Sequence, residues 1–306
     1  MGLFDSVIRL SLPLLPKMVV WGVARRYVAG SDLSDAIERI RALGAQGFGT
    51  IIDVLGESIT KPEQAEEAAR EYEMAMDALA GVDDRCAISV KPTHLGLSLD
   101  LDLCERLLSR LCVQAAAAGR LLRFEMEDSP TVSDTLAVFS KLRQKHSNLS
   151  IVLQARLFRT ADDIARLLAE GPGLDVRLVK GIYIEPADVA HTDGAAITQS
   201  YIELAEQLVA GGARVAFATH DSALADTCVE IANGAGWVTG PALERPYEFQ
   251  LLMGVRAQEA QRLKKAGHRV RVYVPYGKDW YAYSMRRLAG NPEVARHVMR
   301  AMLSRS

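Results

Sequence analysis

The 306-residue sequence has only four cysteines, and no two of them form a CxxC pair. Disulfide frameworks and cysteine-based metal sites need regularly spaced cysteines, so this pattern indicates reduced packing residues in a reducing compartment. The six histidines are scattered and include no HExxH motif or other paired metal-binding spacing. We therefore expect neither a disulfide nor a protein-bound metal.

An excess of one charge is also missing, since 36 lysines and arginines stand against 38 aspartates and glutamates. No basic run stands out, which argues against nucleic acid as a partner. The fractions of hydrophobic residues (49%) and charged residues (24%) are typical of a soluble globular protein.

Long uncharged apolar runs are absent as well. Residues 1–30 are apolar, but Arg9, Pro13, Pro16 and Lys17 interrupt them, so they fall short of the roughly 18 uncharged residues that a membrane-spanning helix needs. The same segment lacks the basic start and the small-residue cleavage site of a secretory signal. We expect residues 1–44 to form a helical segment that caps the body or touches a membrane surface. The protein would then be cytoplasmic, with at most a peripheral contact at the inner face of the membrane.

The GxGxxG dinucleotide fingerprint is missing too, because the nearest match, "GAGWVTG", has Thr239 at the third glycine position. What the sequence does contain is a regular alternation of short β-rich runs and longer helical patterns. The predicted strands are 49–57, 86–92, 121–127, 149–155, 175–181, 214–221, 236–254 and 270–277. The predicted helices include 61–81, 104–119, 132–146, 161–171 and 196–212. This alternation predicts an α/β protein with a (βα)₈ TIM-type barrel over residues 45–306, in one domain.

Polar side chains stand at the C-terminal ends of the predicted strands. They are Glu57, Lys91, Glu125, Gln154, Arg177 with Lys180, Thr219 with His220, Gln250, and Tyr273. A buried strand usually ends in apolar or turn residues, so a polar termination in every strand is hard to explain by packing. In a barrel these ends converge on one mouth, where active sites lie. We therefore expect these side chains to build one site.

Three of these side chains indicate the chemistry of the site. Lys91 and Glu125 end neighbouring predicted strands, so we expect them to form a partly buried ion pair that orients the site. Arg177 is a fixed positive charge, suited to a place beside an electron-accepting ring.

A second group of polar residues lies in "DWYAYSMRRLAGNP" (279–292). On a helix, Tyr283 shares a face with Arg286 and Arg287, which are three and four residues later. Tyr273, Trp280 and Tyr281 add an aromatic wall nearby. Two guanidinium groups beside such a wall can hold a small carboxylate. The site is therefore suited to an organic cofactor and a small anion.

At these residues the sequence resembles the proline dehydrogenase family, in particular its short, single-function bacterial form. The resemblance covers nearly the whole chain. It is carried, in order, by "RYVAGSDLSDAI" (26–37), "DVLGES" (53–58), "SVKPTHLG" (89–96), "FEMEDS" (124–129), "VLQARL" (152–157), "VRLVKGIY" (176–183), "FATHD" (217–221), "YEFQLLMG" (247–254) and "RVYVPYGKDWYAYSMRRLAGNP" (271–292). It implies a distorted (βα)₈ barrel that holds FAD, with a final helix over the substrate site.

The resemblance also implies roles for individual residues. The carboxylate of L-proline would bind Arg286 and Arg287, and the gate of the pocket would be a Glu57–Arg286 pair. The other substrate-binding residues would be Lys91, Leu252, Tyr273 and Tyr283, and the catalytic ones Glu125 and Arg177. FAD would be bound by Met126, Gln154, Arg177, Lys180, Gly181, Ile182, Thr219 and His220.

The reaction that the resemblance implies is hydride transfer from proline C5 to flavin N5, giving Δ¹-pyrroline-5-carboxylate as the first step of proline catabolism. A quinone would take the electrons onward. This chain departs from the family pattern at Glu125, where an aspartate is usual, and at Gly290, where a glutamate is usual.

Three other functions remain open. A dehydrogenase for hydroxyproline or another cyclic imino acid would share the fold, although the bulky Tyr273 would crowd a ring hydroxyl. A Schiff-base aldolase could use Lys91 or Lys180, but it leaves Arg177 and the arginine pair unexplained. The departures at Glu125 and Gly290 would suit a barrel that binds flavin without catalysis.

Overall fold

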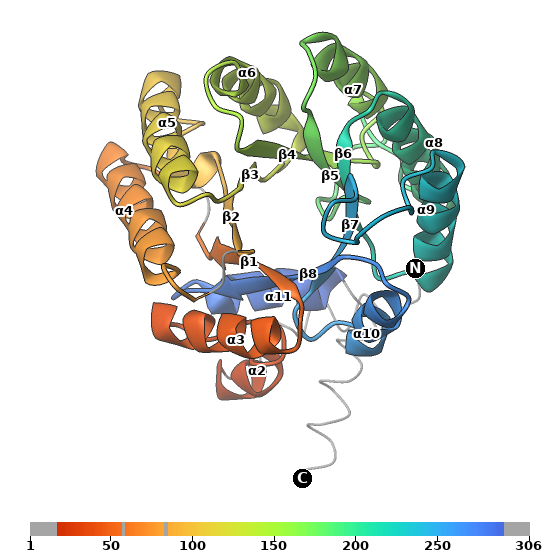
Figure 1. Cartoon of the computed structure of the whole chain (residues 1–306). Helices are drawn as coiled ribbons and strands as arrows, with labels where there is room; N and C mark the ends of the chain where they lie inside the picture. Colours follow the sequence, from red (N-terminus) through yellow and green to blue (C-terminus); the bar gives the residue numbers. More distant parts are fainter. Residues whose placement is uncertain (1–16, 57–58, 83–84, 291–306) are drawn as a thin grey trace, which may run out of the picture.

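The protein is a closed barrel of eight parallel strands that follow one another in sequence order (Figure 1). The computed structural model describes residues 17–56, 59–82 and 85–290. The strands are β1 (Gly49–Val54), β2 (Ala87–Val90), β3 (Leu122–Phe124), β4 (Leu149–Gln154), β5 (Asp175–Val179), β6 (Arg214–Ala218), β7 (Tyr247–Leu252) and β8 (Val270–Tyr276). The barrel closes where β1 pairs with β8. The predicted (βα)₈ fold is confirmed.

Helices surround the barrel and connect its strands (Figure 1). They are α2 (Lys17–Ala24), α3 (Leu33–Ala45), α4 (Pro62–Ala78), α5 (Leu101–Ala117), α6 (Val132–Arg143), α7 (Thr160–Ala169), α8 (Gly194–Ala210), α9 (Ser222–Gly234), α10 (Ala257–Lys265) and α11 (Trp280–Gly290). Two short 3-10 turns, η2 (Thr93–Leu95) and η3 (Ser129–Thr131), follow β2 and β3. Each of the five predicted helical patterns forms a helix.

One predicted strand range is too long. Residues 236–254 contain β7 only from Tyr247 onward. Gly236 and Gly240 have φ angles of 73° and 81°, which belong to the left-handed region and are incompatible with a strand. Residues 236–246 therefore form a loop before the strand begins.

Local signals explain where several helices start. Asp100 accepts hydrogen bonds from the backbone N–H groups of Asp102 and Leu103, both at 3.0 Å, at the N-terminus of α5. Asp193 caps α8 and Asp221 caps α9 in the same way. A capping carboxylate satisfies N–H groups that have no partner inside the helix. Each strand in these repeats is therefore followed by a well-defined helix start.

The main apolar core lies between the strands and the surrounding helices. The four cysteines are buried, as expected for packing residues. Burial raises the pKa of the thiols of Cys104, Cys112 and Cys228 to about 12. At neutral pH these thiols stay protonated, so they contribute to packing and not to nucleophilic chemistry.

The inside of the barrel, which we call the lumen, is polar. Arg123 on β3 contacts Asp175 on β5 at 3.0 Å, and Arg177 on β5 contacts Gln250 on β7 at 3.5 Å. Strands that are not neighbours can meet in this way only through the lumen. Branched apolar residues fill the interior of most TIM barrels, so this lumen of charged side chains is unusual.

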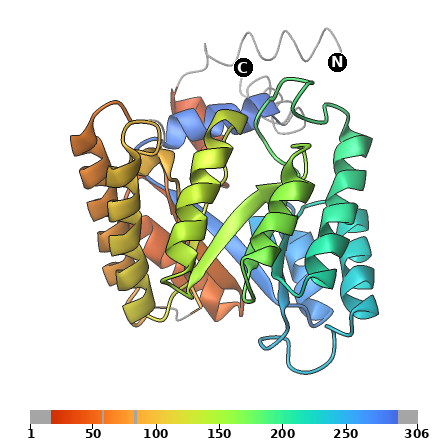
Figure 2. The ribbon, with the colours of Figure 1, turned by 90° about the horizontal axis from the view of Figure 1, so that it is seen from above.

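Two helices cover one end of the barrel. Figure 2 shows α2 (red) and α11 (blue) crossing the upper end, while the loop before β7 lies at the lower end. The two helices contact each other, and the rings of Trp21 and Trp280 meet edge to face with centroids 4.7 Å apart. The covered end is the one where the strands finish, so the last described helix lies over the C-terminal mouth. Within the described residues, no helix has the length and apolar character to cross a membrane.

Candidate active site

Lys91 follows β2 and is buried, with 7% of its surface exposed. Its Nζ lies 2.5 Å from Asp53 Oδ1 and donates to the carbonyl of Val54 at 3.3 Å. The predicted Lys91–Glu125 ion pair is therefore wrong, because Asp53 on β1 takes the ammonium group. Burial alone lowers the pKa of Lys91, but the charge of Asp53 outweighs it and the net pKa is raised. Lys91 stays cationic, which argues against a Schiff-base nucleophile.

Glu125 forms the centre of a second cluster in the mouth. Its Oε1 pairs with Arg177 and accepts hydrogen bonds from Ser89 and, at 3.2 Å, from the Tyr273 hydroxyl. The guanidinium carbon of Arg177 also lies 5.1 Å from the centroid of the Tyr273 ring, within cation–π range. Four strands, β2, β3, β5 and β8, thus bring these groups to one carboxylate oxygen.

The charges of this cluster are fixed by their neighbours. Burial raises the pKa of Glu125, but the Arg177 charge and the Ser89 hydrogen bond outweigh it and the net pKa falls. Burial and the nearby charges of Asp53 and Glu125 raise the pKa of Tyr273 well above its usual range. At neutral pH the cluster therefore presents an ionised carboxylate, a guanidinium and a protonated phenol.

His94 lies on η2, with its ring 6.0 Å from that of Tyr72. Burial, assisted by the charge of Lys91, lowers the pKa of His94 to about 4. The unfolded chain, with a histidine pKa near 6.5, binds more protons between these two values, so stability falls as the pH drops from about 6.5 to about 4. The contribution lost is about 3 kcal/mol.

We expect His94→Gln to flatten the decline in the free energy of unfolding over this pH range, since glutamine cannot titrate. Denaturant unfolding at several pH values between 4 and 7 measures the slope for both proteins. An identical slope in His94→Gln and the unaltered protein would contradict the assignment.

The predicted cofactor residues line a second side of the mouth. Gln154, at the end of β4, is 2% exposed, and its Nε2 donates to the carbonyl of Glu127 at 2.7 Å. Lys180 Nζ lies 3.5 Å from Asp221 Oδ2. Thr219 is buried, and its hydroxyl accepts from the N–H of Asp221 at 3.1 Å. These side chains come from the ends of β4, β5 and β6 and share one side of the barrel.

The remaining predicted cofactor and ring-contacting residues are placed as follows. His220 Nε2 accepts the N–H of Leu252 at 3.0 Å, which places the proton of a neutral ring on Nδ1. Leu252 packs against the apolar cluster of Ile51, Ala87 and Tyr273 inside the lumen. Ile182 is 53% exposed, whereas Met126 is buried in the main apolar core. A cofactor could therefore contact the backbone of Met126 but not its side chain.

The predicted carboxylate clamp lies on α11. Tyr283 is partly buried there, and its charge is among the factors that raise the pKa of Tyr273. Arg286 and Arg287 fall on the same helix, but their side chains lie outside what the structure describes. Glu57, the predicted gate, lies outside the described residues. The clamp and the gate stay predictions.

Three predicted strand-end residues are in fact inside their strands. Arg177 lies in the middle of β5, Gln250 inside β7 and Tyr273 in the middle of β8. Strands in a closed barrel are tilted and staggered, so Tyr273 is level with Leu252, the last residue of β7, although β8 continues to Tyr276. A residue in mid-strand can thus reach the mouth.

Asp53 and Ser89 were not predicted as site residues. Asp53 is fully buried inside the apolar run "GTIIDVLGE". A charged residue at such a position is costly unless it is paired, and this signal could have identified it. Ser89 has no comparable signal, since a serine is tolerated in many buried strands.

A closed barrel with an ion-paired lysine, an arginine–glutamate pair and a phenol at its C-terminal mouth defines a TIM-barrel enzyme. The proline dehydrogenase family model matches residues 36–300. Proline dehydrogenase 2 of Bacillus subtilis (strain 168) is 35% identical over 275 residues, covering 89% of this chain and 88% of that protein. Proline dehydrogenase of Deinococcus radiodurans is 34% identical over 296 residues, covering 94% and 93%. The chain belongs to the proline dehydrogenase family.

Solved structures support the fold. Proline utilization A (PutA) from Bdellovibrio bacteriovorus, inactivated by N-propargylglycine, superposes with a TM-score of 0.80 at 22% identity. The match covers 87% of this chain but only 32% of that longer protein. A bifunctional PutA gives a TM-score of 0.73 at 23% identity, over 89% of this chain and 31% of that one. These likenesses confirm the barrel.

Proposed function

We propose that the protein catalyses the FAD-dependent oxidation of L-proline to Δ¹-pyrroline-5-carboxylate and passes the electrons to a quinone. Membership of the family supports proline as the substrate. The observation that carries the proposal is the Glu125–Arg177 pair, which also accepts a hydrogen bond from the Tyr273 hydroxyl, because it sets a fixed positive charge and a fixed carboxylate side by side in the mouth.

The residues on the cofactor side fit a flavin. Among the described residues, Arg177 Nε and Gln154 Oε1 are buried and have no hydrogen-bond partner. Buried polar atoms of this kind are rare in native proteins and need a partner. A flavin ring edge offers both donors and acceptors, so it could satisfy a guanidinium N–H and an amide oxygen together. When bound, FAD would supply the acceptor for the hydride from C5 of proline.

Gly181 supports the same assignment. Its φ of 99° suits glycine, and a Cβ there would stand 2.8 Å from Gln154 Oε1 and 3.1 Å from Arg156 Cβ. Glycine therefore lets the backbone lie close to Gln154 without a side chain that would clash with its unpaired Oε1. We propose that Lys180, Gly181, Ile182, Thr219, His220 and the backbone of Met126 contribute the remaining contacts to FAD.

The chain's own residues would bind and orient proline. We propose that Arg286 and Arg287 hold the carboxylate, while Tyr273, Tyr283 and Leu252 enclose the ring. The contacts of Glu125 with Ser89, Arg177 and Tyr273 all involve Oε1. Oε2 is therefore the atom that we expect to accept a hydrogen bond from the proline amine. The Lys91–Asp53 pair would form the floor beneath the substrate.

We propose that α11 excludes water when proline is bound, and that Glu57 latches it through Arg286. Closing a site in this way strengthens the electrostatic contacts inside it. Helix α2, which contacts α11, belongs to an N-terminal segment that is apolar in sequence, and this supports a peripheral approach to a membrane and its quinone pool.

The test is the absorption spectrum of the purified full-length protein, before and after anaerobic addition of proline. We expect a flavin spectrum that proline bleaches and that a soluble quinone restores. Trans-4-hydroxyproline serves as the control substrate and should bleach much more slowly, because Tyr273 crowds its hydroxyl. A protein that binds no added FAD would refute the cofactor, and one that binds FAD without bleaching would refute the activity.

A further inference from the structure

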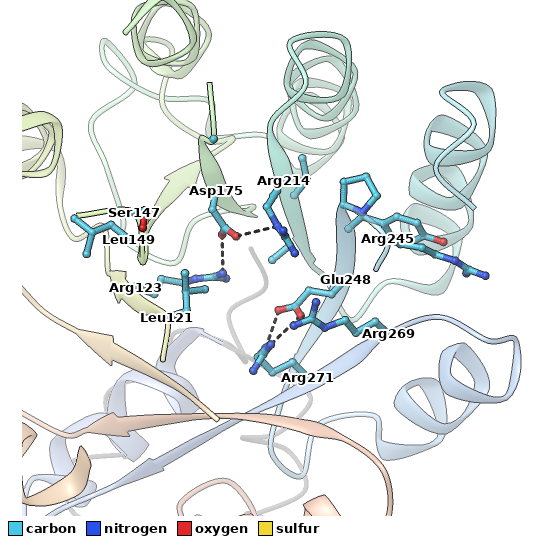
Figure 3. Close-up of a pocket in the computed structure, with 15 residues that line it drawn as sticks. Leu121, Arg123, Ser147, Leu149, Asp175, Arg214, Arg245, Glu248, Arg269 and Arg271 are labelled. Atoms are coloured by element: carbon cyan, nitrogen blue, oxygen red, sulfur yellow. Dashed lines mark hydrogen bonds and ion pairs between the residues drawn. The ribbon is translucent and has the colours of Figure 1, made fainter. Parts of the chain in front are cut away.

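A pocket opens at the N-terminal end of the barrel strands, opposite to the mouth that holds the candidate active site. Figure 3 shows its lining side chains. Its walls come from the starts of β3 to β8 and from the segments just before them, and its volume is about 230 Å³. We call it the basal pocket. Neither the substrate clamp nor the cofactor residues of the proposed function belong to it.

The basal pocket is strongly basic. Its lining includes five arginines, Arg123, Arg214, Arg245, Arg269 and Arg271, but only two acids, Asp175 and Glu248. With the guanidinium groups ionised, these side chains carry a formal charge of +3. A concave site lined by one sign of charge focuses the electrostatic potential and attracts ions of the opposite sign.

Each of the two carboxylates is shared between two arginines (Figure 3). Asp175 lies 3.0 Å from Arg123 Nη2 and 3.8 Å from Arg214 Nε. Glu248 lies 2.8 Å from the Nε atoms of both Arg269 and Arg271. Both carboxylates are therefore already paired with arginines, and the pocket keeps an excess of positive charge.

Arg123 is the clearest sign of a missing partner. The residue is only 1% exposed, yet its Nε and Nη1 have no hydrogen-bond partner among the described residues. Burial lowers its pKa to about 10, and the neighbouring charges of Arg177 and Arg271 act in the same direction. An unsatisfied buried guanidinium is costly, and an anion in the pocket would relieve both the lost hydrogen bonds and the repulsion.

We propose that the basal pocket binds a small multivalent oxyanion of the phosphate type, either as inorganic phosphate or as a phosphate ester. Guanidinium forks match the oxygen geometry of phosphate. The pocket is also smaller than the roughly 300–1,000 Å³ that encloses drug-sized ligands. A dianion would offset most of the positive excess.

The competing reading is a purely structural ion-pair network, since the N-terminal face of a TIM barrel usually serves stability and not catalysis. The two readings differ in one respect. A structural network stabilises the fold in any buffer, whereas a binding site stabilises it in proportion to the occupancy of its ligand.

The test uses the full-length protein with inorganic phosphate as the probe, in calorimetric titration and in thermal unfolding against chloride at equal ionic strength. At a phosphate concentration roughly tenfold above Kd, we expect Tm to rise by about 2–4 °C. A second titration with glycerol 3-phosphate distinguishes the sources, since tighter binding of the ester indicates an esterified ligand and tighter binding of phosphate the free ion.

Substitutions of the lining arginines test whether phosphate binds in the basal pocket. Arg214→Gln and Arg245→Gln should each weaken phosphate binding about fivefold or more. Arg106→Gln, an exposed arginine on α5 with 66% of its side chain accessible, is the matched control and should bind normally. Arg286→Met should also keep phosphate binding, which separates the basal pocket from the proposed substrate clamp. Equal Tm values in phosphate and chloride, or equal affinity in Arg214→Gln, Arg245→Gln and Arg106→Gln, would overturn the proposal.

Discussion

Replacing Glu125 by alanine is expected to abolish most proline-dependent turnover and to destabilise the protein by about 3–5 kcal/mol. The reason is that Arg177 is 5% exposed and Glu125 is the carboxylate paired with it. Without that carboxylate, the contacts left to the buried guanidinium among the described residues are with neutral groups, namely Ser89 and Gln250, each at 3.5 Å, and the Tyr273 ring. Steady-state kinetics with a dye acceptor and denaturant unfolding measure the two effects.

Two further variants give this experiment its controls. Glu125→Asp keeps the charge, so we expect it to retain turnover and most of the stability. Asp128→Ala removes an exposed acid three residues away and should change neither quantity. Turnover of Glu125→Ala equal to that of the unaltered protein, with FAD fully bound, would show that Glu125 has no part in catalysis.

Arg286→Met and Arg287→Met are each expected to raise KM for proline about 10- to 150-fold. A charge-assisted hydrogen bond to a desolvated carboxylate contributes about 1.5–3 kcal/mol. The affinity for a cyclic carboxylate inhibitor should fall by a similar factor, because the inhibitor shares the carboxylate and not the reacting C–H bond. Inhibitor titration therefore isolates binding from the chemical step.

Arg106→Met on the outer face of α5 is the matched control, and its KM should be unaltered. If both α11 variants kept the KM and the inhibition constant of the unaltered protein, the clamp would have to be sought elsewhere. Arg177, which also lies in the mouth, would then be the first candidate for carboxylate binding.

The barrel was predictable because its signals are local. Each strand is a short β-rich run with turn residues at its ends, and acids such as Asp100 and Asp221 mark the starts of helices. The loop at 236–246 was the exception. Its apolar residues resemble those of a strand. The positive φ angles of its glycines, which are incompatible with a strand, become known only from the structure.

The pairings inside the site were less predictable, since they depend on how the strands are staggered. Lys91 and Glu125 end adjacent strands, but Lys91 pairs back to Asp53 on β1, while Glu125 pairs across the lumen to Arg177. The sequence predicts the order of the strands around the barrel, but it does not show which residues of different strands lie at the same height along the barrel axis. Polar residue types at the mouth were thus foreseeable, whereas their partners required the structure.

The polar lumen has a consequence for how the fold responds to temperature. Unfolding exposes Arg123, Arg177 and Arg271, with their carboxylate partners, where most barrels expose branched apolar side chains. Apolar exposure raises the heat capacity of unfolding and polar exposure lowers it, so the curve of stability against temperature is flattened. The cost of keeping ions out of water also declines on heating. The lumen is thus expected to contribute less to stability in the cold and more at high temperature.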